Sequence, residues 1–385
     1  MKLKINRDLL SEMLNTVISV IERKSPAVIL SNVCIILTEE TITLIGSDTE
    51  IEITATAPLL NNECVEKGEI TLPARRLSDL LKALPSGKIV KLGLKDGKMR
   101  IECERSKYEI ATLPTDGYPR FDEEIRNKTM FSISPLSLKS ILDKTKHCMA
   151  VQDVRYYLTG LNIKLDGKIL AAAATDGHRC SIVRTLVNVS EDSERDSFNI
   201  ILPKKAVAET LRFLDTFNQD VNLSVDSATF RFDTIKKNKD DSEIKVSLIA
   251  KLIDGKFPEY ERVVPKDNNN EVKINKEIFK DCLSRATLFS NERLKSVLLL
   301  FSENILKFTA SNIENEQGLE IMDIEYNNKD IELSLNSDYI MTALSVIDSN
   351  EFIFKIGDTN QIALIICDSE IDQNNFTQIV MPMRL

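Results

Sequence analysis

One short stretch of the chain, ATDGHRCS at residues 174–181, combines residue types that could perform nucleophilic chemistry. Asp176, His178 and Ser181 could act as an orienting acid, a base and a nucleophile, provided that their side chains converge in space. The competing interpretation is a turn without catalysis, because Asp-Gly is a common turn sequence. A metal site is disfavoured, because the chain has only one other histidine, His147, which lies in a separate predicted helix.

The composition indicates a cytoplasmic protein of several domains. The chain has 385 residues, of which 43% are hydrophobic, so it can bury more than one core. Its seven cysteines are scattered without a CxxC pair, which favours reduced thiols over a zinc site or disulfides. The N-terminal sequence MKLKINRDLL lacks the apolar region of a signal peptide, and no apolar run is long enough to span a membrane. We therefore expect no cofactor, no metal and no membrane partner.

The sequence repeats one plan three times. A short alternating run followed by an amphipathic helix occurs at residues 3–21, 131–149 and 272–290. A second strand-to-helix pattern occurs at residues 72–84, 202–214 and 335–347. Between these helices, a turn joins two strand-like runs at residues 44–53, 172–183 and 308–321. Because the order is kept in each copy, the sequence predicts three tandem domains.

Each copy is predicted to be an α+β domain, with antiparallel sheet and two helices that cover one sheet face. Segments such as 27–38 and 88–96 are β-branched or alternating, and KDGK at 95–98 is typical of a hairpin turn. We place the domains at residues 1–125, 128–258 and 261–385. The third copy has ASNIEN where the second has its Gly-His-Arg sequence, which argues against a shared catalytic loop.

The charge is distributed unevenly along the chain. The six repeat helices carry a net charge of +7 although the whole chain carries −9, so the remaining residues carry −16. Such a distribution can present a positive surface to a polyanion and repel it elsewhere. The competing interpretation is that Lys and Arg are simply good helix formers on solvated faces. VRYY at 154–157 adds tyrosines beside an arginine, which suits phosphate and sugar contacts, although either tyrosine could instead be core.

Five motifs carry a resemblance to a known family. They are QDVRYYL at 152–158, ATDGHR at 174–179, DGKFPEYERV at 254–263, SNE at 290–292 and MPMRL at 381–385. With a threefold repeat over the whole chain, they resemble the bacterial DNA polymerase III beta subunit family, the sliding clamps. The resemblance implies a head-to-tail homodimer of six similar domains, with helices lining a hole and sheets outside. Such a ring encircles duplex DNA and confers processivity on the polymerase without catalytic activity of its own.

The resemblance also implies a pocket between the second and third domains that binds short partner peptides. The matching positions are Leu158, Thr175, Gly177, His178, Arg179, Cys180, Pro258, Arg262, Val263, Leu294, Asn336, Tyr339, Met381, Pro382, Met383 and Arg384. The methionines would give adaptable apolar contacts, and Gly177 would allow close backbone approach. Cys180 and Leu294 depart from the family's usual larger aliphatic and aromatic residues, so the peptide preference is expected to differ. An exposed Cys180 would also make the pocket sensitive to thiol reagents.

The implied ring requires two further sets of residues. The dimer interface matches Arg76, Arg105 and Lys107 on the first domain, and Leu288, Phe289, Glu314, Glu316 and Glu320 on the third. The matching DNA contacts are Lys24, Gln152, Tyr156 and Tyr157. Opposite charges at the interface would set orientation more than affinity, unless they are only solvated edge-strand residues. The implied partners are a second copy, duplex DNA, the DNA polymerase III alpha subunit, the clamp loader, and other polymerases and repair proteins.

Two other classes of function remain open from the residues alone. A threefold-repeat adaptor that binds peptides without enclosing DNA would be a monomer that DNA does not retain. A hydrolase built on His178 would lose turnover of its substrate when His178 is replaced by alanine.

Overall fold

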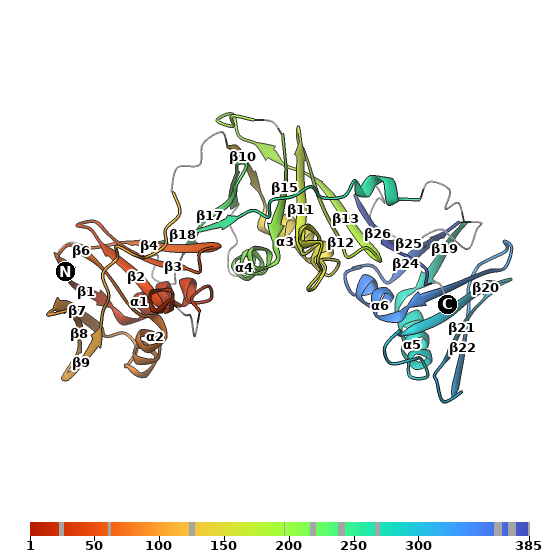
Figure 1. Cartoon of the computed structure of the whole chain (residues 1–385), viewed down its shortest axis with the longest axis horizontal. Helices are drawn as coiled ribbons and strands as arrows, with labels where there is room; N and C mark the ends of the chain where they lie inside the picture. The colour runs from red at the N-terminus through yellow and green to blue at the C-terminus, as the bar shows by residue number, and fades with distance from the viewer. Residues whose placement is uncertain are drawn as a thin grey trace. The chain divides into compact units, whose positions relative to one another are not determined.

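The structure, a computed structural model, describes residues 1–22, 27–60, 63–122, 128–195, 197–215, 221–237, 243–265, 270–357, 364–368 and 375–383. These residues form six α-helices and four sheets of antiparallel strands (Figure 1). No helix among them is long and apolar enough to cross a membrane. The chain folds into two compact units. Unit 1 comprises Met1–Leu136, Asn188–Phe198 and Ala208–Leu252, and unit 2 comprises Ser137–Val187, Asn199–Val207 and Ile253–Leu385.

Unit 1 contains two sheets. The smaller has the order β5-β1-β7-β8-β9, formed by β1 (Lys2–Asn6), β5 (Cys64–Glu66), β7 (Ile89–Lys95), β8 (Lys98–Cys103) and β9 (Ser106–Ala111). The larger has the order β14-β10-β16-β17-β18-β4-β3-β2-β6, formed by β2 (Asn32–Leu37), β3 (Thr41–Ser47), β4 (Ile51–Pro58), β6 (Gly68–Pro73), β10 (Thr129–Ile133), β14 (Asn188–Val189), β16 (Val221–Val225), β17 (Thr229–Lys237) and β18 (Glu243–Lys251). In the larger sheet β18 pairs with β4, so the sheet is continuous across the predicted boundary between the first two domains.

Helices α1 (Arg7–Val17) and α2 (Ala74–Ala83), with the C-terminal part of α4 (Lys204–Leu214), bury their apolar faces in unit 1. The Asn6 side chain begins α1 by accepting a hydrogen bond from the Asp8 N–H. At its other end α1 approaches β3 so closely that a Cβ at Gly46 would lie 2.4 Å from the Val17 carbonyl oxygen. Glycine is therefore required at that position.

Unit 2 also contains two sheets. The larger has the order β15-β11-β12-β13-β26-β25-β24-β19, formed by β11 (Gly160–Asp166), β12 (Ile169–Thr175), β13 (Arg179–Leu186), β15 (Ser197–Pro203, from Asn199 in this unit), β19 (Asn270–Asn275), β24 (Glu351–Ile356), β25 (Leu364–Asp368) and β26 (Phe376–Val380). The smaller has the order β22-β21-β20-β23, formed by β20 (Ser296–Ser302), β21 (Ile305–Ser311), β22 (Gln317–Asp323) and β23 (Ile331–Asn336). Here β13 pairs with β26, which joins the predicted second and third domains in one sheet.

The helices of unit 2 are α3 (Pro135–Lys146), α5 (Lys276–Thr287) and α6 (Ser337–Ser345). Asn275 and Asn336 begin α5 and α6, because each side chain accepts a hydrogen bond from a first-turn N–H. Phe279 of α5 packs edge-to-face on Phe352 and Phe354, with ring centroids 5.2 and 5.3 Å apart. These contacts hold α5 against β24.

The predicted repeat elements are confirmed. Each copy contains two strand–helix pairs, namely β1–α1 and β6–α2, β10–α3 and β15–α4, and β19–α5 and β23–α6. The KDGK hairpin forms as predicted, with Lys95 opposite Lys98 and with positive φ at Asp96 and Gly97. The strand predicted at 27–38 is partly wrong, because Val28–Ser31 form a 3-10 helix with no buried residues and the strand begins only at Asn32.

The compact units differ from the predicted domains in one respect. Unit 1 holds β10, β14 and β16 to β18 of the predicted second domain, and unit 2 holds β11 to β13 and most of α3. The cross-domain strand pairs explain this division, since each joins part of the second domain to a neighbouring domain. The boundaries at 1–125, 128–258 and 261–385 stay predictions.

Candidate functional site

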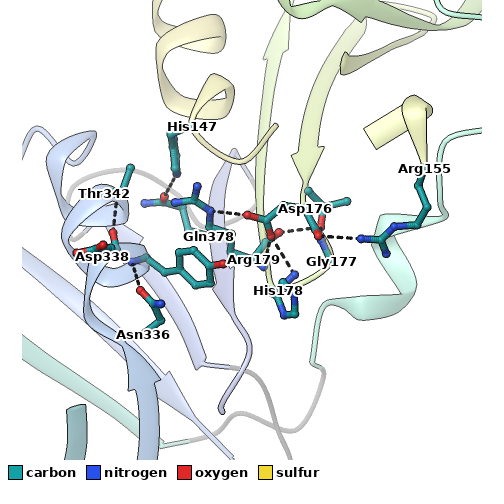
Figure 2. A network of polar contacts seen from close by, with 12 residues as sticks. His147, Arg155, Asp176, Gly177, His178, Arg179, Asn336, Asp338, Thr342 and Gln378 are labelled. Carbon is teal, nitrogen blue, oxygen red and sulfur yellow. Dashed lines mark hydrogen bonds and ion pairs between the residues drawn. The ribbon is translucent and has the colours of Figure 1, made fainter. Parts of the chain in front are cut away.

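The ATDGHRCS stretch forms the end of β12, a tight turn and the start of β13 (Figure 2). The Asp176 carboxylate accepts hydrogen bonds from the N–H groups of His178 (2.9 Å) and Arg179 (3.1 Å). Its second oxygen accepts from Arg179 Nε at 2.9 Å. Thr175 Oγ1 donates to the Arg179 carbonyl oxygen and accepts from the Gly177 N–H. These contacts fix the backbone that carries His178 and Arg179.

The three side chains of the catalytic hypothesis do not converge. Ser181 is buried, and its hydroxyl donates to the carbonyl oxygen of Lys144. The His178 ring is exposed and stacks beside Tyr339, with ring centroids 6.4 Å apart. Because the Asp176 carboxylate is engaged within its own turn, the nucleophile–base hypothesis is wrong and the turn interpretation holds. Within the described ranges, no cluster of three His, Cys, Asp or Glu side chains could hold a metal ion.

Two predicted pocket residues, Leu158 and Cys180, belong to one buried apolar cluster. Its other members include Phe257, Tyr260 and Ile379, which come from the segment before β19 and from β26. The Cys180 side chain is 3% exposed, and burial raises the pKa of its thiol to about 12. A buried and protonated thiol is unreactive. Cys180 therefore lacks the exposure that sensitivity to thiol reagents would require.

Three predicted pocket residues keep apolar surface in solvent. Val263 is 43% exposed, Leu294 48% and Met381 38%. The C-terminal segment is held by its backbone, because Met381 N–H donates to the His178 carbonyl oxygen (2.8 Å) and Met383 N–H donates to that of Ser334 (2.7 Å). The segment therefore runs from the turn to β23, with Pro382 half-buried between the two bonds.

Helix α6 contributes an aromatic contact to the turn. The Arg179 guanidinium carbon lies 4.5 Å from the centroid of the Tyr339 ring, a cation–π arrangement. Asn336 accepts from the Tyr339 N–H and donates to the carbonyl oxygen of Leu294. The structure thus brings together residues of the turn, α6 and the chain preceding β20. Figure 2 shows the Asp176, Arg179 and Asn336 contacts in one view.

Two predicted pocket residues lie in the segment that precedes β19. Pro258 is exposed, and the Arg262 side chain is 80% exposed and pairs with Glu259. This segment is anchored by its buried neighbours Phe257 and Tyr260, which join the apolar cluster. Arg384, the last predicted pocket residue, lies outside the described residues.

Polar contacts link the C-terminal end of α3, and His147 just after it, to the predicted third domain. His147 Nε2 lies 3.0 Å from Gln378 Oε1 (Figure 2). Gln378 Nε2 donates to the Ala343 carbonyl oxygen at 2.8 Å. Lys144 Nζ pairs with Asp348 at 3.1 Å. Burial, aided by the positive charge of Arg179, lowers the pKa of His147 to about 4. The imidazole is therefore neutral at physiological pH.

The predicted DNA-contact residues divide into three cases. Gln152 is exposed with a φ of +54°, and Tyr156 is 57% exposed, so both can meet a ligand. Tyr157 is half-buried and packs against the apolar cluster, which favours the core role for this residue. Lys24 lies outside the described residues.

The predicted interface residues are placed separately on the two units. Arg76, Arg105 and Lys107 are exposed on unit 1. On unit 2, Glu314 and Glu316 are exposed.

The remaining interface positions have partners within their own unit. Leu288 is 79% exposed and Phe289 38%, and the Phe289 ring packs on Gly318, where a Cβ would lie 2.5 Å from it. The Glu320 carboxylate accepts two hydrogen bonds from Arg285, which lower its pKa. Glu320 is thus less available to a second chain than sequence alone suggested.

The sequence analysis did not identify three residues, two on β22 and one beside the turn. Leu319 and Ile321 on β22 are 61% and 52% exposed, whereas apolar residues that alternate with a polar one indicate a buried strand face, so the local pattern could not reveal them. Arg155 donates to the Asp176 carbonyl oxygen at 3.1 Å, a contact that depends on the fold and that no local pattern indicates.

We predict that protonation of His147 destabilises the folded chain in acid. The unfolded chain binds the proton near pH 6.5, whereas the folded chain binds it near pH 4. This contribution to stability is therefore present above pH 6.5 and is lost as the pH falls toward 4, by about 2 kcal/mol between pH 7 and pH 5. Urea unfolding at these two pH values should show a smaller loss for His147→Gln than for the wild type. Substitution of the exposed His178 is the control, and an equal loss in both variants would contradict the assignment.

Family models of the DNA polymerase III beta subunit match the chain in three consecutive parts. The N-terminal domain matches residues 1–122, the central domain residues 132–259 and the C-terminal domain residues 261–384. The three matches agree with three tandem domains of one clamp type.

Known proteins are similar over the full length of the chain. A curated beta sliding clamp of Pseudomonas aeruginosa is 32% identical over 385 residues, and that of Escherichia coli is 30% identical over 385 residues, each covering 100% of both chains. The solved DNA polymerase III subunit beta of P. aeruginosa superimposes with a TM-score of 0.91 at 31% identity over 100% of both chains. A griselimycin-bound sliding clamp of the same species gives 0.89 at 31% identity with the same coverage. The chain therefore belongs to the bacterial DNA polymerase III beta subunit family, the beta sliding clamps.

Proposed function

We propose that this sliding clamp works as a head-to-tail homodimer that encircles duplex DNA in the cytoplasm. The ring tethers the DNA polymerase III alpha subunit, and it accepts the clamp loader and other polymerases and repair proteins through short peptides. The observation that carries the proposal is a pair of exposed sheet edges of opposite charge, one in each unit.

The two edges have complementary chemistry. Strand β9 stands at one end of the five-stranded sheet and β22 at one end of the four-stranded sheet. An edge strand offers unpaired backbone groups to a strand of another chain. Next to β9 lies the exposed Arg105, whereas Glu314 and Glu316 are exposed in the turn before β22. A head-to-tail arrangement pairs the basic edge of one copy with the acidic edge of the other.

Apolar side chains on β22 would supply most of the affinity. Leu319 and Ile321 are exposed, and Leu288 and Phe289 follow the end of the adjacent α5. Burying one such side chain contributes about 1.5–3 kcal/mol. The opposite charges then set the head-to-tail orientation of the two copies, as expected for an interface whose rim is charged.

Contact with DNA is proposed to run through exposed lysines on the helices. Lys82 on α2, and Lys204 and Lys205 on α4, are exposed. Such side chains bind phosphates without reading the base sequence. Lys144 is excluded from this role, because it is buried and paired with Asp348. The positive charge on the helices therefore has both a structural and a DNA-facing part.

Partner peptides are proposed to bind on the surface made by the turn, α6 and the C-terminal segment. Exposed apolar groups lie there next to backbone and guanidinium donors, a combination that suits a short peptide. The relatives from P. aeruginosa and Bartonella birtlesii have been solved with griselimycin bound, so this compound is a suitable probe for the present chain.

We predict that Leu319→Lys combined with Ile321→Lys converts the dimer into a monomer. The substitutions remove apolar contacts and place positive charge opposite a basic edge. Sedimentation velocity should show the monomer mass at concentrations where the wild type is dimeric. The matched control is Leu186→Lys, which changes a 75% exposed leucine on β13 and should leave the dimer intact. A double variant that stays dimeric would contradict the proposed β22 interface.

Deletion of residues 381–385 should abolish peptide binding and preserve the dimer. The deletion removes the bond from Met381 N–H to the turn and the bond from Met383 N–H to Ser334, with the exposed Met381 side chain. Calorimetry with griselimycin measures the loss, and sedimentation checks the dimer. Retained griselimycin binding would count against the assigned peptide site.

A further inference from the structure

The segment between α3 and β11, residues 151–158, projects into solvent. Val154 is 96% exposed and Tyr156 57%, and Gln152 adopts a φ of +54°. The far end of the segment is fixed, because Leu158 is buried and its carbonyl oxygen accepts from the Ala150 N–H. The segment is thus an exposed arch on a buried base, and it carries the proposed DNA contacts Gln152 and Tyr156.

An internal ion pair orients the arginine of this arch. Asp153 Oδ1 accepts from the Arg155 N–H (2.8 Å) and Nε (3.0 Å), and Oδ2 accepts from Nη2 (2.7 Å). These bonds stabilise the carboxylate and lower the pKa of Asp153 to about 2. Asp153 therefore stays ionised and holds the guanidinium in one orientation.

The oriented guanidinium reaches the turn of the proposed peptide site. Arg155 Nη2 donates to the Asp176 carbonyl oxygen at 3.1 Å, as Figure 2 shows. A Cβ at Gly177 would lie only 3.0 Å from Arg155 Nη1, and Gly177 has a φ of +91°. Glycine thus allows the arginine to lie against the backbone of the turn. The residues that follow, His178 and Arg179, are those assigned to the peptide.

We propose that Arg155 is a positioning residue that couples the arch to the turn, so that a DNA phosphate drawn to the arch weakens peptide binding beside the turn. The inference rests on the proposed function for both ligands. The Arg155 side chain is 45% exposed, so a phosphate can reach it. A phosphate is a stronger partner for a guanidinium than a neutral carbonyl oxygen. The phosphate takes the Arg155 Nη2 donor from the Asp176 carbonyl oxygen, while the bond from Arg155 Nε to Asp153 is kept. The turn then loses its contact with Arg155, and the backbone that carries His178 becomes less ordered.

The first test compares griselimycin affinity by calorimetry in the full-length wild type, Arg155→Ala, Arg155→Lys, Gly177→Ala and the Arg155→Ala/Gly177→Ala double variant. We expect Arg155→Ala to bind about fivefold more weakly. Arg155→Lys should not rescue the loss, because an ammonium group lacks the fork that reaches Asp153 and Asp176 together. The double variant should be weaker than Gly177→Ala by much less than fivefold, because both changes break the same contact.

The outcomes separate this inference from the proposed function. A wild type that binds no griselimycin overturns the peptide site and the coupling with it. Normal binding by the wild type and by Arg155→Ala alike overturns the coupling alone. Full rescue by Arg155→Lys, or fully additive effects in the double variant, assigns the loss to charge or to general destabilisation and also overturns it.

The second test measures the coupling to DNA. Griselimycin affinity is compared for the free protein and for the protein loaded on a nicked DNA circle. The wild type should bind about fivefold more weakly on DNA, and Arg155→Ala should bind equally in both states.

Because the chain has only two histidines, the ring signals of His178 in NMR spectra report on the turn, with His147 as the internal reference. A short duplex should shift the His178 signal in the wild type and leave it in place in Arg155→Ala. The same response to DNA in both proteins would refute the coupling.

Discussion

Antiparallel pairing between strand edges is the interaction on which the rest of this structure depends. Strand β4 pairs with β18 in unit 1, and β13 pairs with β26 in unit 2. In each case two repeats satisfy one another's backbone groups, which would otherwise be exposed sheet edges. Strands β9 and β22 remain at sheet ends. The proposed ring would close by the same interaction, used between chains instead of within one.

The β13–β26 pair also builds the proposed peptide site. Its register sets Arg179 opposite Val380, so the residues after Val380 continue alongside the turn. A shift by one residue would turn every side chain of β26 to the other face. Gln378 of β26 meets His147, which follows the end of α3, and this partly buried polar contact favours the observed register. One strand pair therefore joins two repeats and positions the surface that meets partners.

The local elements of the fold could be predicted from sequence, whereas the contacts between them could not. Helical spacing and the KDGK turn indicated α1 and the β7–β8 hairpin, because such patterns depend on neighbouring residues. The strand prediction was wrong at Val28–Ser31, because these residues form a 3-10 helix instead of a strand. The pairing of β4 with β18 involves residues far apart in the chain, and no periodicity encodes it.

The same distinction holds for the candidate site. The resemblance indicated Cys180 and Met381 as pocket residues, and the structure places Cys180 in the buried cluster and Met381 beside the turn. Counting charges could not reveal that Lys144 is buried or that Glu320 is held by Arg285, because both depend on which elements pack together. The contact of Arg155 with the turn belongs to the same class.

The most direct test of the central claim is whether retention on DNA depends on DNA topology. The protein is loaded with a matched clamp loader and ATP onto nicked circular DNA, and the complex is isolated by gel filtration at moderate salt. The DNA is then cut once with a restriction enzyme. An encircling ring stays on the circle and runs off the linear form. Loss from both forms alike, or retention on both, would contradict topological binding and would favour a peptide-binding adaptor that never encloses DNA.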